Sequence, residues 1–448
     1  MKKIKRISKN LANLYLLFTR EPFALALAEE LEHYVVSEGG LLGIVLRDNF
    51  DKDFSIIVLS RDESKQYKAI SVKVDFEDLE KARKELESEM SKDHIIYHND
   101  AKFFDAFKEI KKPEQEHPHF TLLRDDTKYS SAKEAIREVS YHYKDIDGNF
   151  IDQFQSINGF DARLWELYLY CFFREQLFSF NRNHEAPDYI VEKGDAKIAV
   201  EAVVISRKNR DFQPKLLKKR EEMDRMLLNE IPVMVSNAIY DKAKKRYWDK
   251  EHVKGMPFAL AIADFHDAGT MIWTFEAFLT VLYGVRPKVE KGSNSQGSQV
   301  FEEVKSFTKD NGTEISAGLF LQQDYENISA IIYNPTATIS KFNRIGRQAG
   351  LGTFDTSLTW LAAFHDHTPG ALVPQMAKLT IDENFCEPWS GGASILHNPL
   401  AIIPLDPGLF DDGVAHYHFM DNKIISIIPD VHPYNGIMFN DPIRKPSK

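Results

Sequence analysis

Cysteine is nearly absent from this chain. Only two of its 448 residues are cysteines, Cys171 and Cys386, and they lie far apart in the sequence. Two cysteines exclude a framework of several disulfides and a cysteine-rich zinc site. So low a cysteine content is typical of proteins in a reducing compartment, and we expect a cytoplasmic protein.

Long hydrophobic runs are missing as well. The basic N-terminus precedes a short apolar stretch, residues 11–18, which Asn13 interrupts and Arg20 and Glu21 follow. A signal peptide has a longer apolar region, and a membrane helix needs about 20 apolar residues. We therefore expect no contact with a membrane.

The chain has no excess of positive charge, since its formal net charge is −10. Any affinity for nucleic acid must therefore come from a local basic patch. Its 43% hydrophobic content is enough for sizeable cores, and its length predicts more than one domain. We predict an N-terminal α+β module at 1–130, a central core at 131–270 and a C-terminal extension at 271–448.

The N-terminal module is predicted from local patterns. Residues 11–34 have helical spacing, with a break and a fresh start at Pro22. Residues 42–46, 54–59 and 70–76 are typical of strands, and residues 77–90 are typical of a charged helix. Residues 96–130 contain His117 and His119 on either side of Pro118. Such histidines can bind a metal, but no ligand set with metal-like spacing accompanies them, so we predict a polar linker.

Three carboxylates in the central part lie where the surrounding residues are expected to be buried. Glu166 lies in an apolar helix, Asp188 follows Pro187 at the start of a strand, and Glu201 lies within an aliphatic strand. A buried ionised carboxylate costs several kcal/mol unless it is paired or bound to a cation. The three acids therefore indicate a site for a divalent metal ion. For Glu166 alone, a pair with Arg163 or Tyr170 is the alternative.

This arrangement resembles the PD-(D/E)XK nuclease superfamily, and in particular a divergent bacterial member. The matching residues are Glu166 on the first helix, Pro187-Asp188 on one strand and Glu201-Ala202-Val203 on the next, within residues 160–265. The resemblance implies an α/β protein, α+β overall, with a restriction-endonuclease-like αβββαβ core. The N-terminal module and a β-rich C-terminal extension would flank this core. It also implies that Asp188, Glu201 and Glu166 hold magnesium, or manganese, and that a lysine orients the attacking water.

One position departs from the family pattern. The lysine is expected two residues after the second acid, where this chain has Val203. The resemblance then implies a lysine from the following helix, residues 235–248, and the candidates are Lys242 and Lys245. A helix whose basic face is merely solvated is the alternative for both.

Basic residues gather near these acids. Residues 204–255 contain fourteen lysines and arginines against eight acidic residues, an excess of six. Such a patch is suited to backbone phosphates, although a solvated surface is the alternative. Lys341, Arg344 and Arg347 lie near two glycines and form a second candidate, for which an ordinary helix with a glycine cap is the alternative. The candidate phosphate contacts are Arg207, Lys208, Lys218, Lys219, Lys244, Arg246, Lys341, Arg344 and Arg347.

Two functional hypotheses follow. The first is a metal-dependent nuclease that hydrolyses phosphodiester bonds in DNA rather than RNA. A role in bacterial defence against foreign DNA is a further hypothesis. A homodimer would suit such an enzyme, because many nucleases of this kind cut both strands as dimers. The second is a catalytically inactive nuclease-fold protein that binds nucleic acid or assembles with a partner. Val203 favours the second hypothesis, and the three retained acids favour the first.

Overall fold

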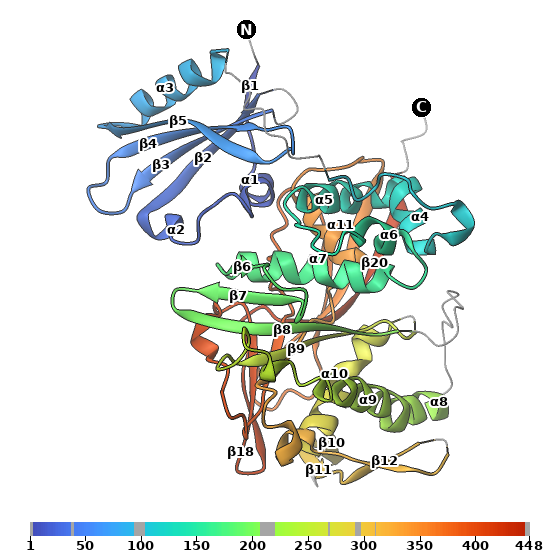
Figure 1. Ribbon diagram of the computed structural model, residues 1–448. Helices are drawn as coiled ribbons and strands as arrows, with labels where there is room; N and C mark the ends of the chain where they lie inside the picture. Colours follow the sequence, from blue (N-terminus) through green and yellow to red (C-terminus); the bar gives the residue numbers. More distant parts are fainter. Residues whose placement is uncertain are drawn as a thin grey trace.

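The structure is a computed structural model that describes residues 3–36, 40–93, 104–206, 220–267, 269–291, 297–309 and 311–443. The described part is a mixed α/β protein with several sheets, the largest of which has eight strands (Figure 1). Among the described residues, no helix combines the length and hydrophobicity needed to cross a membrane.

A five-stranded antiparallel sheet forms the N-terminal module, with its strands in sequential order. Leu86 and Met90 of its last helix pack on the sheet and close a small core of their own. The three predicted strands and the charged helix are confirmed. The elements are β1 (Ile4–Arg6), α1 (Lys9–Leu16), α2 (Ala24–Leu27), β2 (Ala28–Val36), β3 (Leu41–Asp48), β4 (Phe54–Arg61), β5 (Tyr67–Phe76) and α3 (Leu79–Ser91).

The helical structure predicted for residues 11–34, with a break at Pro22, is present as α1 and the short α2 but is wrong for residues 28–34. Helix α1 ends at Leu16, and residues 28–36 form strand β2 between β1 and β3. Hydrogen bonds to two neighbouring strands, together with the β-branched Val35 and Val36, outweigh the helical spacing of this segment.

A layer of helices follows, and it begins inside the predicted linker. Phe107 stacks on Phe120 with ring centroids 5.8 Å apart, and both belong to the main hydrophobic core. The polar linker predicted for residues 96–130 is therefore wrong at Phe107 and within residues 116–125, where Phe120 and Leu123 are buried, whereas residues 108–115 are largely exposed, as expected of a linker. The helices of this layer are α4 (Pro118–Asp125), α5 (Ser130–Ser140), α6 (Phe150–Gln155) and α7 (Phe160–Glu175).

The eight-stranded sheet has the order β19-β18-β17-β14-β9-β8-β7-β6. Strands β8, β9 and β14 are parallel, and β6, β7 and β8 form an antiparallel meander. Every residue of β9 is buried, as expected for a parallel strand that is covered on both faces. The strands are β6 (Ser179–Asn181), β7 (Tyr189–Lys193), β8 (Ala196–Ile205), β9 (Phe258–Asp264), β14 (Ala330–Tyr333), β17 (Ser394–His397), β18 (Ala415–Met420) and β19 (Lys423–Ile427).

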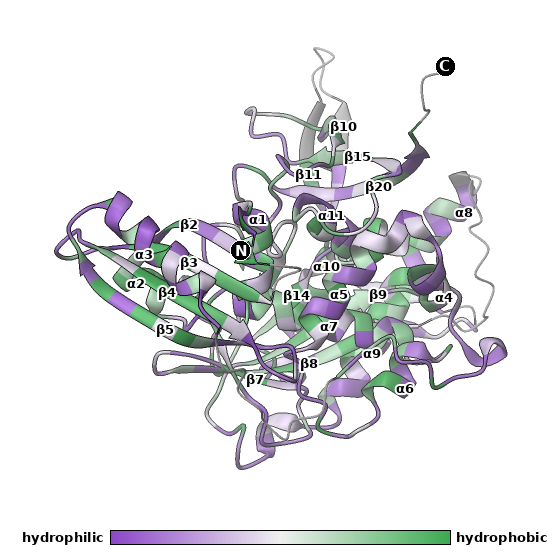
Figure 2. Ribbon diagram, turned by 90° about the horizontal axis from the view of Figure 1, so that it is seen from above, coloured by the Kyte–Doolittle hydropathy of each residue, from purple (hydrophilic) through white to green (hydrophobic). Residues whose placement is uncertain are grey.

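Helices cover both faces of this sheet. Helix α7 lies on one side of β7, β8 and β9, and helices α9 (Ile231–Ala243) and α10 (Thr270–Tyr283) lie on the other (Figure 1). Seen from above, the central strands are largely hydrophobic, whereas α3 at the edge of the molecule is largely hydrophilic (Figure 2). The order α7-β6-β7-β8-α9-β9 is the element order expected for residues 160–265, with α8 (Arg220–Arg225) added before α9.

Residues beyond 270 contribute to the main core and also form a small hydrophobic cluster of their own around Leu358, Trp360 and Ile381. Strands β14, β17, β18 and β19 extend the same sheet, and one hydrophobic cluster contains residues from Leu14 to Phe419. The predicted boundary at 270 thus falls within this sheet and within this hydrophobic cluster. The additional elements are β10 (Val285–Lys291), β11 (Gly297–Glu303), β12 (Ser306–Thr308), β13 (Glu314–Ser316), α11 (Ile339–Gln348), β15 (Thr356–Phe364), β16 (Gln375–Thr380) and β20 (Pro433–Pro442).

Candidate active site

Asp188 and Glu201 lie side by side on one hairpin. Tyr189 of β7 is the register partner of Val200 of β8, so the residue before β7 faces Glu201. The backbone N–H of Ala202 donates to Asp188 Oδ2 at 2.8 Å, and the backbone N–H of Asp188 donates to Glu201 Oε2 at 3.3 Å. Antiparallel pairing thus brings together two acids that are thirteen residues apart.

Glu201 is paired with a lysine from the following helix. The residue is 5% exposed, and its Oε1 accepts a hydrogen bond from Lys242 Nζ at 2.6 Å. Lys242 is half-buried on α9, which packs against β8. Of the two candidate lysines, Lys242 is therefore the one that the tertiary structure brings to the acids.

Lys245 is placed elsewhere, and the catalytic role predicted for it is not supported. The residue is exposed, and its ammonium lies 5.8 Å from the centre of the Tyr247 ring. Helix α9 ends at Ala243, so the helical phase that relates Lys242 to Lys245 in the sequence no longer applies.

Tyr247 is a site residue that the sequence analysis missed. Its hydroxyl donates to Glu201 Oε1 at 2.8 Å. Arg246 has the left-handed φ of 46°, which turns the chain after α9 and directs Tyr247 back to the sheet. Burial, followed by the contact with Glu201, raises the pKa of Tyr247, so that the hydroxyl stays a donor at neutral pH. No local sequence pattern predicts this contact, because it depends on the turn at Arg246.

Glu166 is hydrogen-bonded to one arginine and one tyrosine hydroxyl. Its Oε2 accepts hydrogen bonds from Arg163 at 2.7 Å and from the Tyr143 hydroxyl at 3.1 Å. The pair with Arg163 is the alternative considered from the sequence, whereas Tyr170 donates to the backbone of His142 instead. Burial raises the pKa of Glu166, and Arg163 opposes this shift.

Asp188 is the acid that is least compensated. Burial raises its pKa to about 8, and the nearby negative charges of Glu201 and Glu166 add to the shift. Its Oδ2 accepts the Ala202 N–H, and its Oδ1 receives no hydrogen bond from the described residues. This raised pKa favours the protonated carboxyl, whereas a bound cation would favour the ionised carboxylate.

The donor set fits magnesium. Carboxylate oxygens are the hard ligands that this ion prefers, and it commonly takes one or two of them together with waters and substrate phosphates. Among the described residues, the oxygens of all three acids do not lie within 4.8 Å of one another. Asp188 and Glu201 are therefore the pair that would hold the ion, and Glu166 would act from farther away.

The basic patch is described only in part. The predicted contacts Arg207, Lys208, Lys218 and Lys219 lie outside the described residues. Lys244 is exposed, with its ammonium 4.1 Å from the centre of the Tyr240 ring. Arg246 is exposed and pairs with Asp249 at 2.5 Å. Both residues leave their charges accessible near the turn that carries Tyr247.

The second group of predicted phosphate contacts is buried, so this prediction is wrong. Lys341, Arg344 and Arg347 are 0%, 1% and 3% exposed. Lys341 Nζ and Arg344 Nε lie 2.7 Å and 2.6 Å from oxygens of the buried Glu387. The neighbouring Gly346 lies against the backbone of Ser131, where an added Cβ would approach the carbonyl oxygen to 2.0 Å. The glycine allows close packing of α11 on α5 and does not expose backbone to phosphate.

Comparisons with protein-family models, with curated proteins and with solved structures found no match for the chain. A functional assignment must therefore rest on the geometry of the site.

Proposed function

We propose that the protein is a metal-dependent nuclease with a restriction-endonuclease-like core, which hydrolyses phosphodiester bonds in DNA. The observation that carries the proposal is the contact between Lys242 and Glu201 beside Asp188. Two acids on adjacent strands and a lysine are the set that such hydrolysis requires. The order of the elements around them, helix, three strands, helix and strand, supports the same fold.

Each residue has a distinct role in this proposal. Asp188 and Glu201 would hold magnesium or manganese, which when bound supplies Lewis acidity and lowers the pKa of water. Lys242 would orient the attacking water by donating a hydrogen bond, and its charge would offset negative charge on the phosphate. Tyr247 keeps Glu201 in place, and Arg163 does the same for Glu166.

Substrate binding is assigned to the exposed cations beside the site. Lys244 and Arg246 lie two and four residues after Lys242 and are exposed, so a phosphate backbone can reach them. Contacts of this kind bind DNA without regard to its sequence and weaken as salt rises.

A non-catalytic nucleic-acid-binding protein is the second candidate, and one observation favours it. In this structure Lys242 neutralises Glu201, and burial raises the pKa of Asp188 to about 8, which favours its neutral form. The site is thus electrically compensated without a metal ion.

A cleavage assay separates the two candidates. Purified protein is incubated with supercoiled plasmid, single-stranded DNA and RNA, with magnesium, manganese or EDTA. The nuclease proposal expects metal-dependent cleavage that Asp188→Ala, Glu201→Ala and Lys242→Ala abolish and that the matched control Lys245→Ala retains. Cleavage that survives Asp188→Ala and Glu201→Ala would contradict the proposal. DNA binding without cleavage would support the second candidate.

A further inference from the structure

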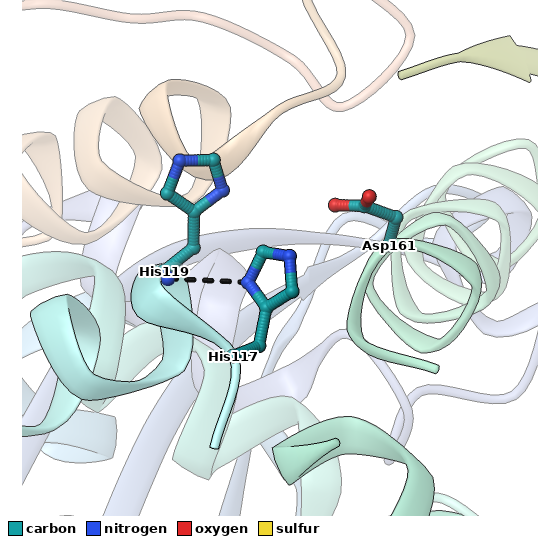
Figure 3. Close-up of side chains that lie close together, drawn as sticks. All are labelled: His117, His119 and Asp161. Carbon is teal, nitrogen blue, oxygen red and sulfur yellow. Dashed lines mark hydrogen bonds between the residues drawn. The ribbon is translucent and has the colours of Figure 1, made fainter. Parts of the chain in front are cut away.

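A second group of metal-ligating side chains lies away from the acids described above. His117 and His119, at the start of α4, meet Asp161 in the first turn of α7. One ligand atom from each residue lies within 4.8 Å of the other two. The two ring nitrogens and the carboxylate point toward a common space (Figure 3).

The fold holds His117 in this position from two sides. Its Nδ1 accepts the backbone N–H of His119 at 3.1 Å and so caps α4. Its ring stacks on Phe160, with centroids 4.7 Å apart and planes 9° apart. Because Nδ1 is directed at the helix, Nε2 is directed at Asp161 (Figure 3). Phe160 and Asp161 are adjacent, so the stacking also places the carboxylate.

The group is accessible on one side. His117 is buried, Asp161 is half-buried and His119 is exposed. A cavity of about 430 Å³ adjoins the three residues and is lined also by Asp264 and Thr270. It lies beyond the carboxyl ends of the parallel strands β9 and β14, where ligands of α/β proteins commonly bind.

We propose that His117, His119 and Asp161 bind a divalent transition-metal ion, with zinc as the first choice. Two imidazole nitrogens and one carboxylate oxygen form a ligand set that suits zinc and its neighbours better than magnesium. Three protein ligands leave at least one coordination position for water or a bound anion from the cavity. A closed structural site would instead use four protein ligands.

This site is separate from the acids of the proposed active site. Asp161 precedes Glu166 by five residues on α7, which is about 7.5 Å along the helix axis and places the two side chains on different sides of the helix. The proposal therefore does not depend on nuclease activity.

Metal binding changes one hydrogen bond in the structure. A neutral imidazole that coordinates through Nε2 carries its proton on Nδ1, but Nδ1 of His117 now accepts the His119 N–H. Coordination therefore replaces this capping bond, while the stacking on Phe160 is kept. The backbone amide of His119 reports this exchange in a nuclear magnetic resonance spectrum.

Titration of the metal-free full chain with Co²⁺, followed by visible absorption, tests the proposal. Nitrogen ligation in a low-coordinate site gives intense bands, whereas the acids offer only oxygen ligands. We expect one equivalent of Co²⁺ to bind with such bands, Zn²⁺ to displace it, and the His119 amide resonance to shift. Asp188→Asn combined with Glu201→Gln should leave these bands unchanged.

Variants of the three ligands complete the test. His119→Ala, Asp161→Asn and His117→Asn should each weaken Zn²⁺ binding at least tenfold, and the exposed His184→Ala is the matched control that should not. Asparagine at 117 still caps α4, so loss of binding there is not loss of the helix. Thermal unfolding verifies that each variant is folded. Absence of the bands, equal affinity in folded His119→Ala and Asp161→Asn, or loss of the bands in the double acid variant would overturn the proposal.

Discussion

The ammonium of Lys242 lies 2.6 Å from Oε1 of Glu201, although the two residues are 41 positions apart in the chain. Both side chains are largely withdrawn from solvent, with 21% and 6% of their surface exposed. The contact joins helix α9 to strand β8 at the point where Asp188 approaches from β7. It links the chemistry proposed for the site to the stability of the fold.

Removing this lysine should affect activity and stability together. Lys242→Met leaves Glu201 buried without its cation, and breaking a buried ion pair costs about 3 kcal/mol. We expect activity to fall by about 100-fold or more, since a positioned proton donor or acceptor contributes on that scale. Denaturant unfolding and plasmid cleavage measure the two effects.

A double variant separates these effects. Lys242→Met with Glu201→Gln removes both charges, so stability should return toward that of the wild type while activity stays lost. A double variant as unstable as Lys242→Met alone would show that the pair is not the source of the stability change.

Asp188 should make stability depend on pH. Its pKa is about 8 in the folded protein and about 4 in an unfolded chain. Between these two pH values the carboxyl binds a proton in the folded state but not in the unfolded state. The contribution of Asp188 to the free energy of unfolding is therefore complete below about pH 4 and is lost as pH rises toward 8. The loss has an upper limit of about 1.4 kcal/mol per pH unit. In Asp188→Asn this contribution to the slope of the free energy of unfolding against pH should be absent.

Chemical unfolding of both proteins at pH 5 and at pH 8 measures the difference. From pH 5 to pH 8 the free energy of unfolding of the wild type should fall relative to that of Asp188→Asn. Magnesium should narrow this gap at pH 8, because it binds the ionised carboxylate of the wild type. Parallel stability curves for the two proteins would contradict the raised pKa.

The exposed cations after α9 should contribute to DNA affinity without contributing to stability. Lys244→Ala with Arg246→Ala removes two charges that are accessible to phosphates. We expect weaker binding of DNA of any sequence, and a slope of log K against log salt that is shallower by about 2. Fluorescence anisotropy at several salt concentrations measures this, and Lys254→Ala, an exposed lysine more distant in the chain, is the control.

Glu387 should be a structural residue. It receives the buried charges of Lys341 and Arg344, and Lys341 Nζ also donates to the backbone carbonyls of Pro388 at 2.8 Å and Gly391 at 3.0 Å. Glu387→Gln should destabilise the protein by about 3–5 kcal/mol, because it removes the carboxylate charge that both buried cations contact. Thermal unfolding measures the loss. A weakened DNA affinity with unchanged stability would instead return Lys341 and Arg344 to the role expected from the sequence.

Much of the fold follows from local patterns in the chain. The strands at β3, β4, β5 and β9 have continuous or alternating apolar residues, and these patterns depend on neighbours only a few positions away. The adjacency of Asp188 and Glu201 is local in the same sense, because one tight hairpin sets their register. Strand β2 could not be recognised, because its helical spacing is overruled by strands on both sides.

What tertiary structure decided is where charges from distant segments meet. The sequence supplied Lys242 and Lys245 as equal candidates, and the end of α9 at Ala243 selected the first. The sequence also shows basic residues at 341 and 344. They are buried because they pair with Glu387, which lies more than forty positions later in the chain. His117 and Asp161 are likewise brought together by a tertiary contact, the stacking of His117 on Phe160 at the start of α7. Backbone preferences act over a few residues, whereas burial and ion pairing depend on which segments the completed fold places together.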